Sequence, residues 1–161
     1  MLNLSTRIKL QPESSRVRFM CEATGITQII LLDTGSPNTI ITLDLANQLG
    51  LKSRRSDMAQ IHLVGQKIDV VPVVLPNLVL GDLRLERVKV YAGLGLSWGR
   101  IMLLGLNVLN QMVYTIDRRE GSGFIEISLP ENPAPDAFNR LIGRDGKYYI
   151  IDLEESENGT F

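Results

Sequence analysis

The side chains with the clearest chemical potential lie in the stretch LLDTGSPNTIIT, residues 31–42. The apolar run at residues 29–32 predicts a strand buried on both faces, and it ends directly in the acid Asp33. Small and hydroxyl residues follow: Thr34, Gly35 and Ser36. Asp, Gly and Ser are turn formers, so these residues alone are also typical of an ordinary turn. A carboxylate delivered by a buried strand, however, costs free energy unless it is hydrogen bonded or shares a proton, which favours a catalytic role for Asp33.

The sequence contains few of the residues that other kinds of catalytic or metal site need. With one cysteine, Cys21, and one histidine, His62, the chain lacks the ligands of a structural zinc site and cannot form an intrachain disulfide. A Cys–His nucleophile pair would require these two residues to meet, whereas a buried cysteine and an exposed histidine are more common. A glycosidase needs a second acid at a defined separation, and no local pattern favours any of three candidates: Asp44, Asp69 and Asp117. We expect no metal and no cofactor.

Length and charge limit the remaining classes. The chain has 161 residues and 44% hydrophobic composition, which predicts one globular domain with a substantial core. Seventeen basic and eighteen acidic residues give a net charge of −1, so no basic field attracts nucleic acid or an anionic membrane. The N-terminal stretch lacks an apolar core of secretory-signal length, and no segment reaches the ~18 apolar residues of a membrane span. We expect a cytoplasmic protein.

The elements that must position Asp33 are mainly strands. Residues 16–32 predict two strands around a turn at Thr24 and Gly25. Residues 60–92 predict further strands, with turns at 64–66, 76–77 and 81–82 and a phase change near 86–87 that is typical of a bulge. Later strands are predicted at residues 112–116, 124–129 and 145–153. The glycine-rich stretch GLGLSWG, residues 93–99, lacks the lysine of a phosphate-binding loop and predicts a mobile connection.

A second apolar run reaches Gly105, and both runs have the order strand, glycine, short helix, so two short helices are predicted after them. The first follows Thr42 as N-cap, has Leu45 and Leu49 on one face, and stops at Gly50. The second follows Gly105, with Asn107 as the capping residue.

Two segments together carry a family resemblance. The sequence ILLDTGSPNTIITLDLANQLGL, followed about seventy residues later by IMLLGLNVLNQMVYTID, resembles the retropepsin-like aspartic proteases, which are single-domain relatives of pepsin. The family motif is two apolar residues, Asp, Thr or Ser, Gly, and Ala or Ser. Its second landmark, an apolar pair and a glycine before a short helix, is matched by Leu103, Leu104 and Gly105. The resemblance covers roughly residues 15–129. It implies an all-β, closed and barrel-like acid protease fold, with one short helix after each landmark.

The resemblance also implies a homodimeric aspartic endopeptidase without metal or cofactor. The chemistry needs two carboxylates, and the family supplies the second from an identical subunit. Two Asp33 side chains near ~3 Å apart share one proton; the ionised one activates a water, and the protonated one donates to the oxyanion. The family assigns Thr34 a hydrogen bond across the dimer and Gly35 the close approach of the two loops. Ser36 is expected to donate to the outer oxygen of Asp33.

The substrate implied by the resemblance is an extended peptide. We expect apolar residues beside the cut, because Ile40, Ile41 and the family's flap offer apolar walls. The hairpin around residues 62–68 stands where the family has this flap, a mobile hairpin that closes over the peptide, although an ordinary edge hairpin has the same pattern. The candidate flap comprises His62, Leu63, Val64, Gly65, Gln66, Lys67 and Ile68.

The sequence divides into an N-terminal segment (1–14), a protease domain (15–129) and a C-terminal extension (130–161). The stretch FIEISLP, residues 124–130, is a candidate to interleave with its partner in a dimer sheet. The extension departs from the simplest family pattern: its segment KYYIIDL extends the interface, covers a sheet edge, or lies in the cleft as an inhibitor, and an acidic tail follows. A non-catalytic dimerisation or peptide-binding module with the same fold is the alternative function, because fold does not prove activity.

Overall fold

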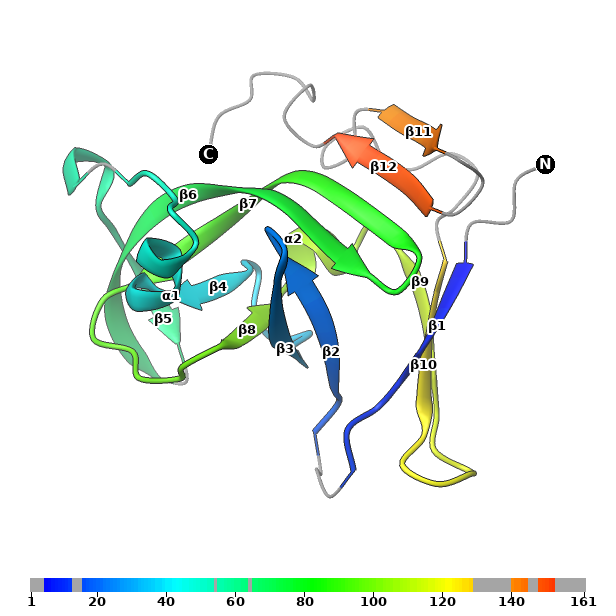
Figure 1. Cartoon of the computed structure of the whole chain (residues 1–161). Coiled ribbons are helices and arrows are strands. Elements are labelled where there is room, and N and C mark those ends of the chain that lie inside the picture. The colour runs from blue at the N-terminus through cyan, green and yellow to red at the C-terminus, as the bar shows by residue number, and fades with distance from the viewer. Residues whose placement is uncertain are drawn as a thin grey trace.

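The computed structural model describes residues 5–12, 16–53, 55–63, 65–128, 140–144 and 148–152. Strands dominate this part of the chain (Figure 1). The strands are β1 (Ser5–Lys9), β2 (Arg18–Ala23), β3 (Ile26–Leu32), β4 (Ile40–Thr42), β5 (Ala59–Leu63), β6 (Gln66–Leu80), β7 (Leu83–Gly93), β8 (Ile101–Leu104), β9 (Val113–Asp117), β10 (Phe124–Ser128), β11 (Arg140–Arg144) and β12 (Tyr148–Asp152). The helices are α1 (Leu43–Gln48), α2 (Leu106–Leu109) and a 3₁₀ turn, η1 (Arg55–Asp57). The expected all-β fold, with a short helix after each landmark, is confirmed.

Six of these strands close into a barrel. Their order is β7-β4-β8-β3-β2-β6, and β6 pairs back with β7. At the centre, β3 and β8 run parallel with Leu32 opposite Leu104, so the two apolar runs lie side by side (Figure 1). Neighbouring strands pair with the edges of both runs, and side chains pack on both of their faces. This burial explains why both runs are apolar on two faces. They end together, which brings Asp33 next to Gly105.

Two local predictions are confirmed. Thr24 (φ 51°) and Gly25 (φ 79°) form the two-residue turn between β2 and β3; positive φ at both residues is the type I′ geometry that suits a twisted hairpin. Thr42 caps α1, because its Oγ1 accepts the backbone N–H of Leu45 at 3.0 Å. Gly50 follows the helix with φ 71°.

The predicted turn at residues 76–77 is wrong, because β6 continues through it as one strand. Pro76 is exposed and stands opposite Arg87, between the paired residues Leu75–Val88 and Asn77–Glu86. A proline, which has no N–H to donate, is tolerated where the ladder makes no pair. The pairing offset is the same on both sides, so no extra residue forms a bulge; the predicted phase change comes instead with Arg87 in the left-handed region (φ 52°).

A separate three-stranded sheet has the order β1-β10-β9. Strand β1, which the sequence did not predict, pairs with β10 from Ser5–Ser128 to Lys9–Phe124. The Oγ1 of Thr6 accepts the N–H of Asp82 at 2.9 Å and so ties this sheet to the turn between β6 and β7. Within the chain β10 is paired along both edges, so the expected interleaving of this segment with a partner subunit stays a prediction.

The described part of the C-terminal extension, β11 and β12, covers a sheet edge, which is one of the three expected alternatives. Strand β12 pairs in parallel with residues 83–86 of β7, and β11 pairs with β12 (Figure 1). Residues 83–86 face residues 77–80 of β6, whereas β5 pairs with residues 66–70. Along β6, seven residues or about 23 Å therefore separate the part of the sheet that β12 covers from the part that pairs with β5. The predicted acidic tail lies outside the described residues.

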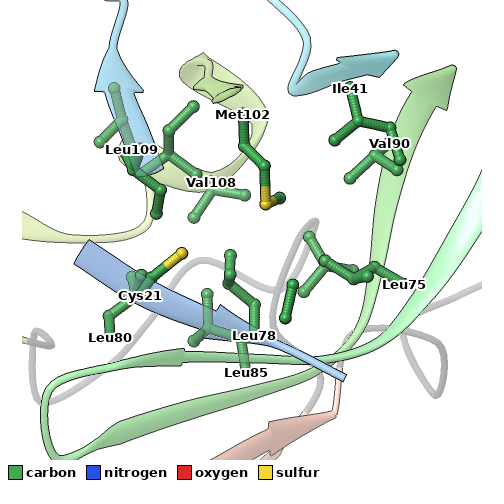
Figure 2. Packing of buried hydrophobic residues seen from close by; sticks show 14 of the residues in the cluster. Cys21, Ile41, Leu75, Leu78, Leu80, Leu85, Val90, Met102, Val108 and Leu109 are labelled. Carbon is green, nitrogen blue, oxygen red and sulfur yellow. The ribbon is translucent and has the colours of Figure 1, made fainter. Parts of the chain in front are cut away.

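The barrel interior holds the main hydrophobic core (Figure 2). Fully buried side chains come from all six barrel strands and α2, among them Phe19, Ile30, Leu75 and Met102. Figure 2 shows Cys21 among these apolar side chains. No helix in the described part of the chain is long and apolar enough to cross a membrane.

Burial makes Cys21 an unreactive thiol. It raises the pKa of Cys21 to about 12, and the charge of Glu22 adds a smaller effect in the same direction. The thiolate fraction near pH 8 is then about 10³-fold lower than in an unfolded chain. We expect a disulfide reagent such as DTNB to label native protein slowly and urea-unfolded protein at once. Equally fast labelling of both states would contradict this placement.

Because only the unfolded thiol ionises between about pH 8.5 and 12, Cys21 also lowers the free energy of unfolding as pH rises through that range.

Candidate active site

Asp33 stands in the loop that leaves β3, with its side chain partly exposed. Its backbone N–H donates to the carbonyl of Leu104 at 3.0 Å, so the end of β8 fixes the start of the loop. Its carboxylate Oδ1 accepts the N–H of Gly35 at 2.9 Å. A Cβ at Gly35 would lie 3.2 Å from this oxygen, which is tight contact. The loop therefore presents an oriented carboxylate at the protein surface.

Ser36 supports the loop differently from the expectation. Its hydroxyl donates to the carbonyl of Asn38 at 2.7 Å, and its Oγ accepts the Asn38 N–H at 3.4 Å. A hydroxyl has one proton, so Ser36 does not donate to Asp33 and that expectation is wrong. The side chain is buried and closes the turn at residues 36–38 instead.

Sequence reasoning missed Thr39 as a site residue and misplaced Asn107. Thr39 is fully buried; its hydroxyl donates to Oδ1 of Asn107 at 2.7 Å and accepts the N–H of Gly105 at 3.2 Å. The Asn107 amide also donates to the carbonyl of Lys89 at 3.0 Å. The N-cap of α2 is Gly105, so Asn107 lies inside the helix rather than capping it. A polar residue in an otherwise apolar helix was the available signal.

The second landmark packs directly on the Asp33 loop. The first amides of α2 need acceptors, and the loop provides them: Leu106 N–H donates to Ser36 O at 2.8 Å and Asn107 N–H to Pro37 O at 3.1 Å. A Cβ at Gly105 would lie 2.5 Å from the carbonyl carbon of Asn38 and closer still to its oxygen. Glycine thus permits an approach of two backbones that no other residue allows.

Thr34 is exposed, and its hydroxyl has no hydrogen-bond partner among the residues that the structure describes. Leu103, by contrast, is buried and pairs with Ile40. The structure therefore brings together the Asp-Thr-Gly-Ser loop and all three residues of the second landmark. Thr34 and Gly35 are exposed, whereas Leu103 is buried in the cluster that it shares with Ile40 and the hairpin.

The candidate flap is a hairpin of β5 and the start of β6. Leu63 and Ile68 turn toward the protein, whereas His62, Gly65, Gln66 and Lys67 are exposed; Val64 lies outside the described residues. Ile40 and Ile41, which were expected to form apolar walls, lie in different clusters. Ile40 packs with the hairpin, whereas Ile41 belongs to the barrel core.

The other acids considered lie in different surroundings. Asp117 is held by Arg119, with Nη2 to Oδ2 at 2.8 Å, and this pair lowers the pKa of Asp117 well below its usual range. Asp69 accepts a hydrogen bond from Gln60, and Asp44 is exposed in the first turn of α1. His62 is exposed and Cys21 is buried, so they form no nucleophile pair. Across the described ranges, no three His, Cys, Asp or Glu side chains gather closely enough to hold a metal ion.

Comparison with known proteins adds two findings. A family model described as aspartyl protease matches residues 19–108, more than half of the chain, and spans the Asp33 loop, the hairpin and Gly105. The structure is similar to a retropepsin-like aspartic protease from Rickettsia conorii, with 18% identity, 80% of this chain and 93% of that chain covered, and a TM-score of 0.56.

A second similar structure is EIAV protease in complex with an inhibitor, with 16% identity, 62% and 90% coverage, and a TM-score of 0.50. None of the curated proteins matches the sequence. At these identities the structural likeness establishes the retropepsin fold alone.

Proposed function

The chain belongs to the aspartyl protease family, and we propose that it is an aspartic endopeptidase in which Asp33 of two identical protomers activates one water. The observation that carries this proposal is the Asp33 loop. The partly exposed carboxylate of Asp33 directly follows a buried strand and is oriented by the Gly35 amide. The loop that carries it packs against the backbone at Gly105. Such rigid placement of an acid at the surface is what acid–base catalysis requires.

Two carboxyl groups are needed, and one Asp-Thr-Gly motif is present per chain. When two Asp33 side chains meet across a two-fold axis at ~3 Å, one proton is shared between them. The ionised carboxylate takes a proton from the water that attacks the peptide carbonyl. The protonated carboxyl donates to the oxyanion that forms. In this proposal the exposed Thr34 hydroxyl bonds to the partner's loop.

The exposed edge of β9 is our proposed dimer interface. Among the described strands β9 pairs only with β10, so its other edge is free. This strand carries two exposed apolar residues, Val113 (56% exposed) and Ile116 (36% exposed). A free edge with apolar side chains readily accepts another strand. Because β9 begins just after α2, which supports the Asp33 loop, pairing there holds two such loops near each other.

The substrate is an extended peptide with apolar residues beside the cut. The β5–β6 hairpin, acting as a flap, offers backbone for pairing, and the cluster containing Ile40 and Leu103 offers an apolar wall. We therefore expect a peptide-library digest to show apolar residues at the cut sites. Charged residues favoured on both sides would contradict this preference.

Mixing active and inactive subunits tests the shared site. An equal mixture of wild type and Asp33→Asn, allowed to exchange subunits at fixed total concentration, should retain about one quarter of the wild-type activity, because only wild-type pairs are complete. The matched control is Asp44→Asn, the same chemical change on exposed α1, and this mixture should keep full activity. Retention of about one half with Asp33→Asn would mean that each protomer acts alone.

A further inference from the structure

A second apolar cluster lies apart from the barrel core and joins the β5–β6 hairpin to the connection between β7 and β8. Its buried members are Ile40, Leu63 and Leu103, and its partly buried members are Ile61, Ile68, Leu96 and Trp98. Leu96 and Trp98 belong to the glycine-rich stretch 93–99, which the sequence predicts as a mobile connection. This connection therefore supplies side chains that pack against the same apolar cluster as the hairpin residues.

We propose that Trp98, together with Leu96, latches the hairpin onto its own barrel, so that the hairpin opens above Asp33 only when the Trp98 contact breaks. Trp98 is then a positioning residue that acts through the hairpin. This inference rests on the proposed function only for the role of the hairpin as a flap.

The connection is anchored to the hairpin strand itself. The N–H of Leu94 donates to the carbonyl of Asp69 at 2.9 Å, and Asp69 follows Ile68 in β6. A Cβ at Gly93 would lie 3.1 Å from Cγ of Leu96 and 3.3 Å from Cδ1 of Ile68. The absence of a side chain at Gly93 thus lets the connection and the hairpin approach closely.

The far end of the connection is also fixed. The carbonyl of Arg100 accepts the N–H of Ile29 at 3.1 Å, and the carbonyl of Gly99 accepts the Thr42 hydroxyl at 3.5 Å. Trp98 therefore stands between an anchor on the hairpin strand, at Leu94, and anchors on the barrel, at Gly99 and Arg100. From this position its ring packs against the cluster to which the hairpin contributes Leu63.

The hairpin has an apolar underside that needs such a contact. Ile61 and Ile68 are opposite each other, and both are partly buried in the cluster, whereas the neighbouring pair His62 and Lys67 is exposed. A two-stranded ribbon alone is marginally stable in water, so the packing of this face decides how often the hairpin opens. A tryptophan supplies a large apolar area for that purpose.

The cluster also reaches the site. Leu103 lies in it, and the carbonyl of the next residue, Leu104, accepts the Asp33 N–H at 3.0 Å. Opening of the hairpin consequently uncovers an apolar wall beside Asp33. Weaker latching favours the open hairpin and so weakens substrate binding, while the reacting groups themselves are unchanged.

Hydrogen exchange of the full-length chain tests the latch. In Trp98→Ala the protected amides of β5 and of residues 66–70 should exchange about tenfold faster or more than in wild type, while amides of β3 and β8 keep their rates. Trp98→Phe, which retains a ring, should restore most of the protection. The matched control, Leu51→Ala, removes a partly buried side chain that packs on the main core and should leave hairpin exchange unchanged.

A second variant keeps the test open if Trp98→Ala does not fold. Trp98 is the one tryptophan of the chain, so in Leu96→Ala its fluorescence emission should move to longer wavelength as water reaches the loosened ring. On peptide substrate, Trp98→Ala should raise KM several-fold with kcat nearly unchanged. Equal hairpin exchange in wild type and variant, equal acceleration throughout the barrel, or faster hairpin exchange with unchanged KM would each overturn the proposal. If wild type cuts no peptide, the proposed function fails, whereas local exchange still supports the latch.

Discussion

Asp33→Asn is expected to abolish peptide hydrolysis, with a loss of about 10³-fold or more, while the fold and the dimer remain. Asparagine has almost the same shape as aspartate, so the acceptor of the Gly35 N–H is kept. It cannot hold or exchange the shared proton, and with two such residues no group remains to activate the water. The measurement is cleavage of a mixed peptide library between about pH 4 and 7, with the molecular size of both proteins determined in parallel.

Asp44→Asn again serves as the control, because it removes the same charge from an exposed helix position and should cut at the wild-type rate. Residual cleavage by Asp33→Asn near the wild-type rate would place the chemistry elsewhere. If wild type and Asp33→Asn are both dimers and neither cuts, the non-catalytic peptide-binding or dimerisation module becomes the better account of this chain.

Gly105→Ala is expected to lower the free energy of unfolding by about 3 kcal/mol or more and to remove activity with it. The backbone at Gly105 is extended (φ −103°, ψ −174°), which alanine adopts without strain. The cost arises from the added methyl group, which would meet the carbonyl groups of Asn38 and Ser36. Relief of that contact requires the Asp33 loop and α2 to move apart. Urea unfolding of wild type and variant gives the difference.

Gly99→Ala is the matched control for Gly105→Ala. Gly99 has φ 67°, and no atom lies within 4 Å of the position that a Cβ would take, so its alanine variant carries backbone strain alone, about 1 kcal/mol. A Gly105→Ala protein as stable as Gly99→Ala would show that the two backbones do not approach as closely as described.

Short-range signals in the sequence predicted the parts of the site that one segment determines. The turn at Thr24 and Gly25, and the helix capped by Thr42, depend on residues within a few positions of each other. The apolar runs before Asp33 and Gly105 predicted buried strands for the same reason. Their parallel pairing joins residues about seventy positions apart, and the sequence did not predict it.

The remaining features depend on contacts between distant residues. The hydrogen bond from Thr39 to Asn107 spans 68 positions. In the sequence, Asn107 is equally typical of a helix cap, and Thr39 is equally typical of any buried threonine. The carboxylate of Asp33 and the carbonyl of Asn38 are both close enough in sequence to accept the hydrogen bond of the Ser36 hydroxyl. Only the fold shows that the carbonyl of Asn38 accepts it. Strand β1 was unpredicted because its partner, β10, lies more than a hundred residues away.

The placement of β10 between β1 and β9 implies that a newly made chain folds before it dimerises. Each protomer completes this sheet with its own strands, so its folding is a first-order process that needs no second chain. In the proposed dimer, activity then appears in a later, second-order step, when two finished β9 edges meet. If the proposed dimer is the active form, a dilute chain is folded but inactive, and hydrolysis begins only when synthesis has raised the concentration enough for dimers to form.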